Sequence, residues 1–235
     1  MNAMPRVLVV GAGGLGSPLL RLLARSAVDH ITIVDDDVVE ESDLHRQTLY
    51  SSDDVGRSKL DAAEEVLRGL SPNLSVRTVE GRFVPGTAID LLSDHDLIVE
   101  GADNLATKFL VADAARLAGV PAVQAGAVRW AGWAFCALPD SSCLRCVFED
   151  IPADRIETCA EAGVLGPVVG VLGGLEAALA VRLLRGEHPG GELWHYDALG
   201  GALRKTFVRR RRECPLCAGE IKDLRMDRYA APCAA

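Results

Sequence analysis

Residues 5–16 read PRVLVVGAGGLG, and this stretch decides the fold. Arg6 to Val10 is a nearly continuous apolar run, typical of a central strand buried on both faces of a parallel sheet. Ser17 can then cap a helix that runs from Pro18 to about Ala27. Three glycines at G-x-G-x-x-G spacing lie between strand and helix: Gly11, Gly13 and Gly16. This unit predicts a phosphate cradle, because bare backbone lets a ligand approach N–H groups at the positive end of the helix dipole.

Length and composition predict a soluble globular protein. The chain has 235 residues, of which 49% are hydrophobic and 25% charged, so it can bury a full core. Its formal net charge of −8 disfavours a nucleic-acid duplex as the main partner, since phosphate binding needs an excess of Lys and Arg. The basic run from Arg209 to Arg212 is interpreted as a solvated strand end.

Neither a signal peptide nor a membrane span is expected. The first apolar run leads into a glycine loop rather than a cleavage site. Val164 to Leu184 is the longest apolar stretch, but Glu176, Arg182 and several glycines interrupt it, which favours a buried helix. We therefore expect a cytoplasmic protein, in which cysteines indicate metal binding or thiol chemistry rather than disulfides.

A second strand is predicted from His30 to Val34, and Asp35, Asp36 and Asp37 follow it. Asp35 lies 19 residues after Gly16, where nucleotide-binding α/β folds place the carboxylate that takes the ribose hydroxyls. The plain alternative is a solvated acidic turn. We interpret Asp36 in that way and Asp35 as ribose-binding.

Lys59 and the pair Asp103 and Asn104 are further candidate functional residues. Lys59 begins a helix capped by Ser58, where the helix dipole repels a cation, so a nearby anion is expected. Asp96 to Glu100 is typical of a parallel strand, and Asp103 and Asn104 lie just past its end, where open α/β sheets bind ligands. Capping of the next helix is an alternative role for one of these two residues.

The regular alternation of strand and helix ends near Ala125. Antiparallel strands and one buried helix, from Gly166 to Gly186, are predicted beyond it. The expected fold is α/β and Rossmann-like: a mainly parallel sheet flanked by helices, with an antiparallel C-terminal portion. We expect one domain over residues 1–235, divided into a nucleotide-binding half (1–125), an antiparallel half (126–218) and a tail (219–235).

Two C-x-x-C pairs predict a structural metal site. Cys143 with Cys146, and Cys214 with Cys217, can supply four thiolates to one tetrahedral Zn²⁺ and leave no open position for catalysis. Since 67 residues lie between the pairs, tertiary structure must bring them together. A redox role is the weaker alternative, because neither pair has a thioredoxin-like strand-to-helix setting.

The remaining cysteines differ in setting. Cys159 lies in a predicted loop, within the polar sequence ETCAE, where thiol chemistry is accessible. Cys136 is expected in the core and Cys233 in the tail.

Seven motifs in chain order make this sequence resemble the ThiF/MoeB/HesA family: GAGGLGSP, SDLHRQTLY, GRSK, GADN, CLRC, ETCAEAGVLGP and CPLC. Members activate ubiquitin-like sulfur-carrier proteins and are related to the ubiquitin-activating enzymes. The resemblance covers residues 5 to about 218. It implies that ATP and the C-terminal glycine carboxylate of a small carrier ending in Gly-Gly give an acyl-adenylate and pyrophosphate, ahead of sulfur transfer. It also implies Mg²⁺, a structural Zn²⁺ and a homodimer, and it makes residues 126–218 the zinc- and carrier-binding half.

The resemblance implies a role for individual residues. Arg46 and Lys59 match phosphate-contacting cations, Asp103 an Mg²⁺ ligand and Asp35 the ribose-binding carboxylate. Cys159 matches a crossover-loop cysteine that takes part in acyl or sulfur transfer in some relatives. The predicted nucleotide site comprises Gly11, Gly13, Gly14, Gly16, Asp35, Asp37, Ser42, Asp43, Arg46, Gln47, Lys59, Asp103 and Asn104.

The sequence departs from the family pattern in two places. Relatives carry an N-terminal helical segment whose arginine reaches the ATP of a dimer neighbour, whereas only a few residues precede Val7 here. Arg21, Arg25 and Arg129 are candidate substitutes for that arginine. Asp43 stands where relatives commonly have asparagine, which adds a negative charge near the nucleotide.

Three alternatives stay open. One is a non-catalytic module that holds a carrier or partner. Another is a nicotinamide oxidoreductase, which fits the glycine motif and Asp35 but leaves Arg46, Lys59 and Asp103 without a role in hydride transfer. A relative that adenylates a modified tRNA base is disfavoured by the acidic balance of the chain.

Overall fold

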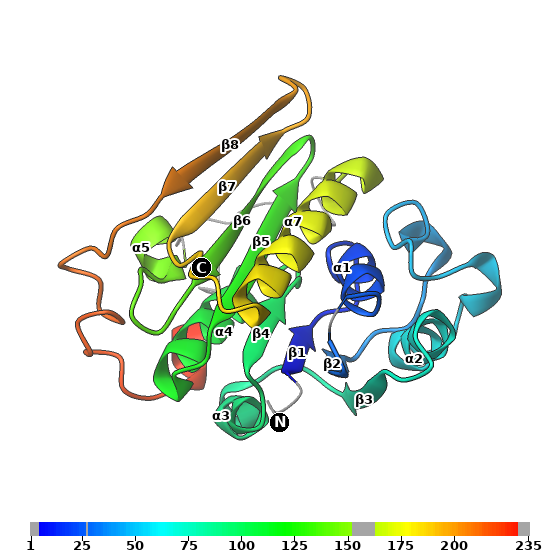
Figure 1. Cartoon of the computed structure of the whole chain (residues 1–235), viewed down its shortest axis with the longest axis horizontal. Coiled ribbons are helices and arrows are strands. Elements are labelled where there is room, and N and C mark those ends of the chain that lie inside the picture. The colour runs from blue at the N-terminus through cyan, green and yellow to red at the C-terminus, as the bar shows by residue number, and fades with distance from the viewer. Residues whose placement is uncertain (1–4, 27, 152–162, 230–235) are drawn as a thin grey trace, which may run out of the picture.

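The computed structural model describes residues 5–26, 28–151 and 163–229 (Figure 1). They form an eight-stranded sheet with the strand order β3-β2-β1-β4-β5-β6-β7-β8. The strands are β1 (Arg6–Val10), β2 (His30–Asp35), β3 (Ser75–Glu80), β4 (Leu97–Glu100), β5 (Ala122–Val128), β6 (Ala131–Ala137), β7 (Glu192–Asp197) and β8 (Ala202–Phe207). Strands β1 to β5 pair in parallel and β5 to β8 antiparallel, which confirms the predicted fold class.

Helices cover both faces of this sheet (Figure 1). They are α1 (Gly16–Leu23), α2 (Lys59–Leu70), α3 (Pro85–Ser93), α4 (Leu105–Ala118), α5 (Leu144–Phe148) and α7 (Gly166–Leu184), with 3₁₀ turns η1 (Glu41–Asp43), η2 (Ser52–Asp54) and η3 (Met226–Tyr229). Helices α1, α2 and α7 pack on one face and α3 and α4 on the other. The antiparallel strands carry α5 on the same face as α4.

Strand β1 is central because each of its faces meets a separate core. Val7 and Val9 join the core under α1 and α7, whereas Leu8 and Val10 join the core under α3 and α4. Val9 lies opposite Ile33 of β2 and is fully buried. A strand in this position needs apolar side chains on both faces, as its sequence predicts.

The start of α1 differs from the prediction. The helix begins at Gly16, so Ser17 lies inside the first turn instead of capping it, and its hydroxyl donates to the carbonyl of Ala12 at 3.2 Å. The cause is the tight approach of the loop to the helix, since a Cβ on Gly16 would lie 2.0 Å from the carbonyl oxygen of Gly11. Helix α3 was not predicted.

Helix α7 is a core helix, as predicted. By length and composition alone it could cross a membrane, a test that buried helices of soluble proteins also pass. Val168, Leu172 and Ala180 are buried against the sheet and α1. The approach to α1 is close, because a Cβ on Gly173 would lie 2.7 Å from the carbonyl oxygen of Leu15.

Candidate functional site

The ends of three parallel strands bring the predicted nucleotide-binding loops together. In the sheet register, Val10 of β1 lies opposite Val34 of β2 and Glu100 of β4. The glycine loop, the three aspartates and the Gly101–Asn104 turn therefore leave the same edge of the sheet side by side. Open α/β sheets bind ligands at this edge.

The glycine loop packs directly on the turn after β4. Gly11 has a φ of +92°, and a Cβ there would lie 3.2 Å from the backbone nitrogen of Ala102. Gly13 and Gly14 are less crowded, and side chains approach them from the segment after β2. Gln47 lies near Gly13 and Arg46 near Gly14, each 3.8 Å from the position of a Cβ.

The carboxylate of Asp35 forms a hydrogen bond with the backbone of the glycine loop. One of its carboxylate oxygens accepts the N–H of Ala12 at 2.7 Å, and the other accepts the N–H of Asp37 at 2.9 Å. Burial raises the pKa of Asp35, an effect that these two N–H groups oppose. Tyr50, which sequence reasoning missed, donates its hydroxyl to the carbonyl of Ala12 at 2.9 Å. A tyrosine in an otherwise polar stretch was the signal for it.

The protein itself supplies the anions expected beside Lys59. The lysine is 4% exposed, and its Nζ lies 2.9 Å from Asp37 Oδ2 and 3.8 Å from Asp43 Oδ2. Asp43 also pairs with Arg46, whose Nη2 lies 2.7 Å from Asp43 Oδ1. Arg46 donates a second hydrogen bond, from Nη1 to the carbonyl of Ser42 at 3.1 Å. Asp43 therefore forms ion pairs with both cations that are predicted to contact phosphate.

Asp103 and Asn104 have different roles in the turn after β4. Asn104 caps α4, because its Oδ1 accepts the N–H of Thr107 at 2.8 Å. Asp103 is exposed, and within residues 5–26, 28–151 and 163–229 its side chain has no hydrogen bond or ion pair. Capping therefore explains Asn104 and leaves the carboxylate of Asp103 available to a ligand. Carboxylate oxygens are ligands that Mg²⁺ prefers.

The four predicted zinc ligands gather at the other end of the molecule. The Sγ–Sγ distance is 3.8 Å for Cys143–Cys146, 3.5 Å for Cys143–Cys214 and 3.6 Å for Cys146–Cys217. Four sulfurs around one Zn²⁺ at about 2.3 Å stand roughly 3.8 Å apart, so this set fits the ion. The prediction that tertiary structure joins the two pairs is confirmed.

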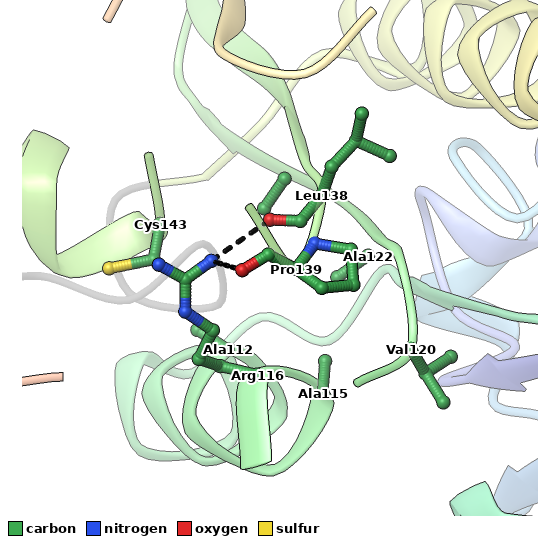
Figure 2. A pocket seen from close by; sticks show the side chains of 9 residues that line it. Ala112, Ala115, Arg116, Val120, Ala122, Leu138, Pro139 and Cys143 are labelled. Atoms are coloured by element: carbon green, nitrogen blue, oxygen red, sulfur yellow. Dashed lines mark hydrogen bonds between the residues drawn. The ribbon is translucent and has the colours of Figure 1, made fainter. Parts of the chain in front are cut away.

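Two arginines connect this cluster to α4. Arg116 donates to the Sγ of Cys217 at 3.1 Å and to the carbonyls of Leu138 and Pro139. Figure 2 shows its guanidinium reaching these carbonyls beside a small pocket with a mostly apolar lining. The pocket includes Ala122 at the start of β5, so it lies at the edge of the sheet opposite the nucleotide-binding loops.

The second arginine, Arg145, lies inside the first C-x-x-C pair and is 1% exposed. Its Nε and Nη2 donate to the two oxygens of Asp113 on α4, at 2.8 and 2.9 Å. Tyr229 of η3 also donates to Asp113, at 2.8 Å. This network was not predicted, because its three members are far apart in the sequence.

The other predicted residues are placed as follows. Cys159 and Cys233 lie outside the described residues, whereas Cys136 is buried in the core as expected. Arg21 donates to the carbonyl of Thr48 at 3.3 Å, and Arg129 lies between β5 and β6. In the basic run, Arg211 is not purely solvated, because it donates to the carbonyl of Arg145 at 3.0 Å.

Comparison with known proteins gives consistent matches. A model of the ThiF family matches residues 2–216. The SAMP-activating enzyme E1 of Haloferax volcanii is 37% identical over 97% of this chain and 86% of that protein. The sulfur carrier protein adenylyltransferase of Thermus thermophilus is 39% identical over 97% of this chain and 87% of that protein. Among solved structures, E. coli MccB with ATP has the same fold, with a TM-score of 0.78 and 22% identity over 91% of this chain and 66% of that chain.

Proposed function

Because this chain belongs to the ThiF family, we propose that it adenylates the C-terminal carboxylate of a ubiquitin-like sulfur-carrier protein. It is a nucleotidyltransferase that uses ATP. The observation that supports this site is that three charged residues belong to the segments beside the glycine loop. Arg46 lies near Gly14, and Lys59 pairs with Asp37 and Asp43. Asp103 lies in the turn that packs on Gly11, and its carboxylate has no hydrogen bond or ion pair among the described residues. A hydride-transferring enzyme has no use for such a set of charges.

In the proposed reaction, an oxygen of the carrier's terminal carboxylate attacks the α-phosphorus of ATP. A bond forms between that oxygen and the phosphorus, and the bond to the bridging oxygen breaks, which releases pyrophosphate. No general base is required, because a terminal carboxylate is already ionised at neutral pH. Catalysis therefore depends on position and on charge stabilisation.

Arg46 and Lys59 are proposed to stabilise the negative charge that develops on the phosphates. Both cations already lie near the glycine loop, held by Asp43 and Asp37. Arg46 has five N–H donors, of which two are taken among the described residues, by the carboxylate of Asp43 and the carbonyl of Ser42. The remaining donors of its guanidinium are available to phosphate oxygens.

Asp103 is the residue proposed to hold Mg²⁺, which when bound neutralises part of the phosphate charge. Zn²⁺ is proposed at the four-cysteine cluster, where four thiolates leave no open position, so its role is structural. A carrier ending in Gly-Gly, a homodimer, a cytoplasmic location and a transfer role for Cys159 belong to the same proposal. The carrier, the homodimer and the role of Cys159 follow from the family resemblance, whereas the location is the expectation from the apolar patterns of the sequence.

ATP–pyrophosphate exchange with a carrier ending in Gly-Gly tests the assignment. Asp103→Ala and Lys59→Ala are expected to lower the exchange rate about 100-fold or more, as the loss of groups that stabilise transition-state charge does. Asp90→Ala, at an exposed position of α3, is the matched control and should leave the rate unchanged. Exchange that survives both site substitutions would overturn the site. A wild-type protein that does not bind Mg·ATP in calorimetry would instead indicate a non-catalytic module.

A further inference from the structure

We propose that Glu100 is a positioning residue, which holds the turn carrying Asp103 by accepting the backbone N–H of Ala102. This inference rests on the proposed function, because it concerns the placement of the proposed Mg²⁺ ligand. Glu100 is the last residue of β4 and is fully buried. Its Oε1 accepts the N–H of Ala102 at 2.7 Å.

Two side chains hold the carboxylate of Glu100 in place. Lys108 of α4 is 4% exposed, and its Nζ donates to Oε1 at 3.1 Å and to Oε2 at 3.2 Å. Gln124 of β5 donates to Oε2 at 3.1 Å and also to the carbonyl of Lys108 at 2.8 Å. Lys108 donates in addition to the carbonyl of Ala125. The carboxylate is thus held by side chains from α4 and β5.

Stability alone does not account for this buried ion pair. Desolvation of two charges offsets most of their attraction, and apolar side chains of similar volume often stabilise a protein as well. What an apolar pair cannot do is accept an N–H in a fixed direction. Among the described residues, the backbone N–H that the Glu100 side chain accepts is that of Ala102, which lies two residues after the end of β4 in the turn that leads to Asp103.

The position of this turn also affects the glycine loop. Gly11 approaches the nitrogen of Ala102, and a Cβ on Gly101 would lie 3.0 Å from the nitrogen of Gly16. A shift of the turn therefore also shifts the glycine loop. Within the described parts of the chain, the carboxylate of Asp103 has no hydrogen bond or ion pair that would keep it in place. Its placement depends on the backbone that Glu100 holds.

Two double variants test the side-chain oxygen that accepts the Ala102 N–H separately from the ion pair of Glu100 and Lys108. Glu100→Gln with Lys108→Met keeps an acceptor oxygen for Ala102, whereas Glu100→Leu with Lys108→Met removes it. Both variants lack buried charge, so both are expected to fold. We expect the Leu variant to need about 10- to 100-fold more Mg²⁺ for half-maximal binding of 1,N6-etheno-ATP, a fluorescent ATP analogue with an unmodified ribose, as the loss of a group that orients a metal ligand does. The Gln variant should stay close to the wild type.

The second measurement is hydrogen exchange of the Ala102 amide in the protein without nucleotide. Protection is expected in the wild type and in the Gln variant, and its loss is expected in the Leu variant. If the Leu variant does not fold, Glu100→Asn with Lys108→Met takes its place, because it withdraws the acceptor oxygen by one methylene group and leaves no charge at this position.

The control is a second buried ion pair on α4, removed by Asp113→Leu with Arg145→Met, which should leave the Mg²⁺ requirement unchanged. Equal Mg²⁺ requirements and equal Ala102 protection in the Gln and Leu variants would overturn the inference. A wild type that does not bind the ATP analogue would overturn the proposed function instead. The exchange of the Ala102 amide would then decide the inference alone.

Discussion

At the scale of single residues, Asp43 sets the charge balance of the candidate site. It is 6% exposed and pairs with both Arg46 and Lys59. Phosphate oxygens must therefore compete with this carboxylate for the same two cations. Asparagine at this position would keep a hydrogen-bond acceptor for Arg46 and remove the competing charge.

We expect Asp43→Asn to tighten the binding of Mg·ATP about tenfold, because removing one nearby negative charge at a partly buried site is worth roughly 1–2 kcal/mol. Calorimetric titration measures this change. Asp54→Asn is the matched control, since Asp54, the last residue of η2, forms an ion pair of the same spacing and length, 2.7 Å, with Arg57. Unchanged or weaker binding in Asp43→Asn would mean that the carboxylate orients the cations rather than competing for them.

A second residue-scale feature is the carboxyl group of Glu176 on α7. It is fully buried, and neither of its oxygens has a hydrogen-bond partner among the residues that the structure describes. Burial raises its pKa well above the usual value, and the carboxylate of Glu100 adds to the effect while Lys108 opposes it. The folded protein therefore keeps a proton that the unfolded chain releases.

This difference predicts the pH dependence of stability. Above the ordinary pKa of a glutamate, the folded state binds more protons than the unfolded state, so the free energy of unfolding falls as pH rises. Glu176→Gln has no proton to lose. We expect its advantage over the wild type to grow between about pH 5 and pH 8, by at most about 1.4 kcal/mol per pH unit. Melting temperatures across this range measure it, with the exposed Glu220→Gln as control. A constant difference would show that Glu176 is ionised when folded.

At the scale of elements, local patterns predicted the parts of the site that depend on strand ends. Apolar runs identified β1, β2 and β4, and Gly119 ends α4 with a φ of +70°. The predicted start of α1 was wrong, because the contact of Gly16 with Gly11 overrides the capping preference of Ser17. Helix and strand patterns in the sequence do not predict a backbone contact such as the one between Gly11 and Gly16.

Side-chain partners were harder to predict than elements. An anion near Lys59 could be expected from the helix dipole, but its identity required knowing that Asp37 lies across the loop. The pair of Glu100 and Lys108 was missed altogether. A charged residue at the end of an apolar strand was the signal for it, and buried charges are normally paired.

The contact between Gly11 and Gly16 makes an element-scale prediction. Gly16→Ala would place a Cβ 2.0 Å from a carbonyl oxygen, so the loop or α1 must shift. We expect a loss of at least about 1–3 kcal/mol in stability, together with weaker nucleotide binding. Gly69→Ala in α2 is the control, because a Cβ there meets nothing within 4 Å, and alanine in a helix stabilises by up to about 1 kcal/mol. Chemical denaturation measures both variants, and equal stabilities would contradict the packing argument.

At the scale of the whole molecule, we propose that the two halves, residues 1–125 and 126–218, fold as one domain. Support comes from the core beneath α7, which contains Val9 from the first half and Ala134 from the second. The four-cysteine cluster adds a second connection, because Arg116 and Arg145 link it to α4. The far end of α4 carries the Asp103 turn, which Glu100 holds independently of the cluster.

This arrangement predicts that removal of zinc affects stability much more than nucleotide binding. Structural Zn²⁺ in small peptides contributes apparent binding free energies of about 10–16 kcal/mol, so chelation should lower the melting temperature strongly. Since the nucleotide-binding loops lie at the other edge of the sheet, affinity for the fluorescent ATP analogue below that temperature should change less than about threefold. Metal analysis should find one zinc per chain, lost in Cys214→Ser and kept in Cys136→Ala, a buried cysteine outside the cluster. Lost nucleotide affinity at an unchanged melting temperature would instead place the metal in the chemistry of the site.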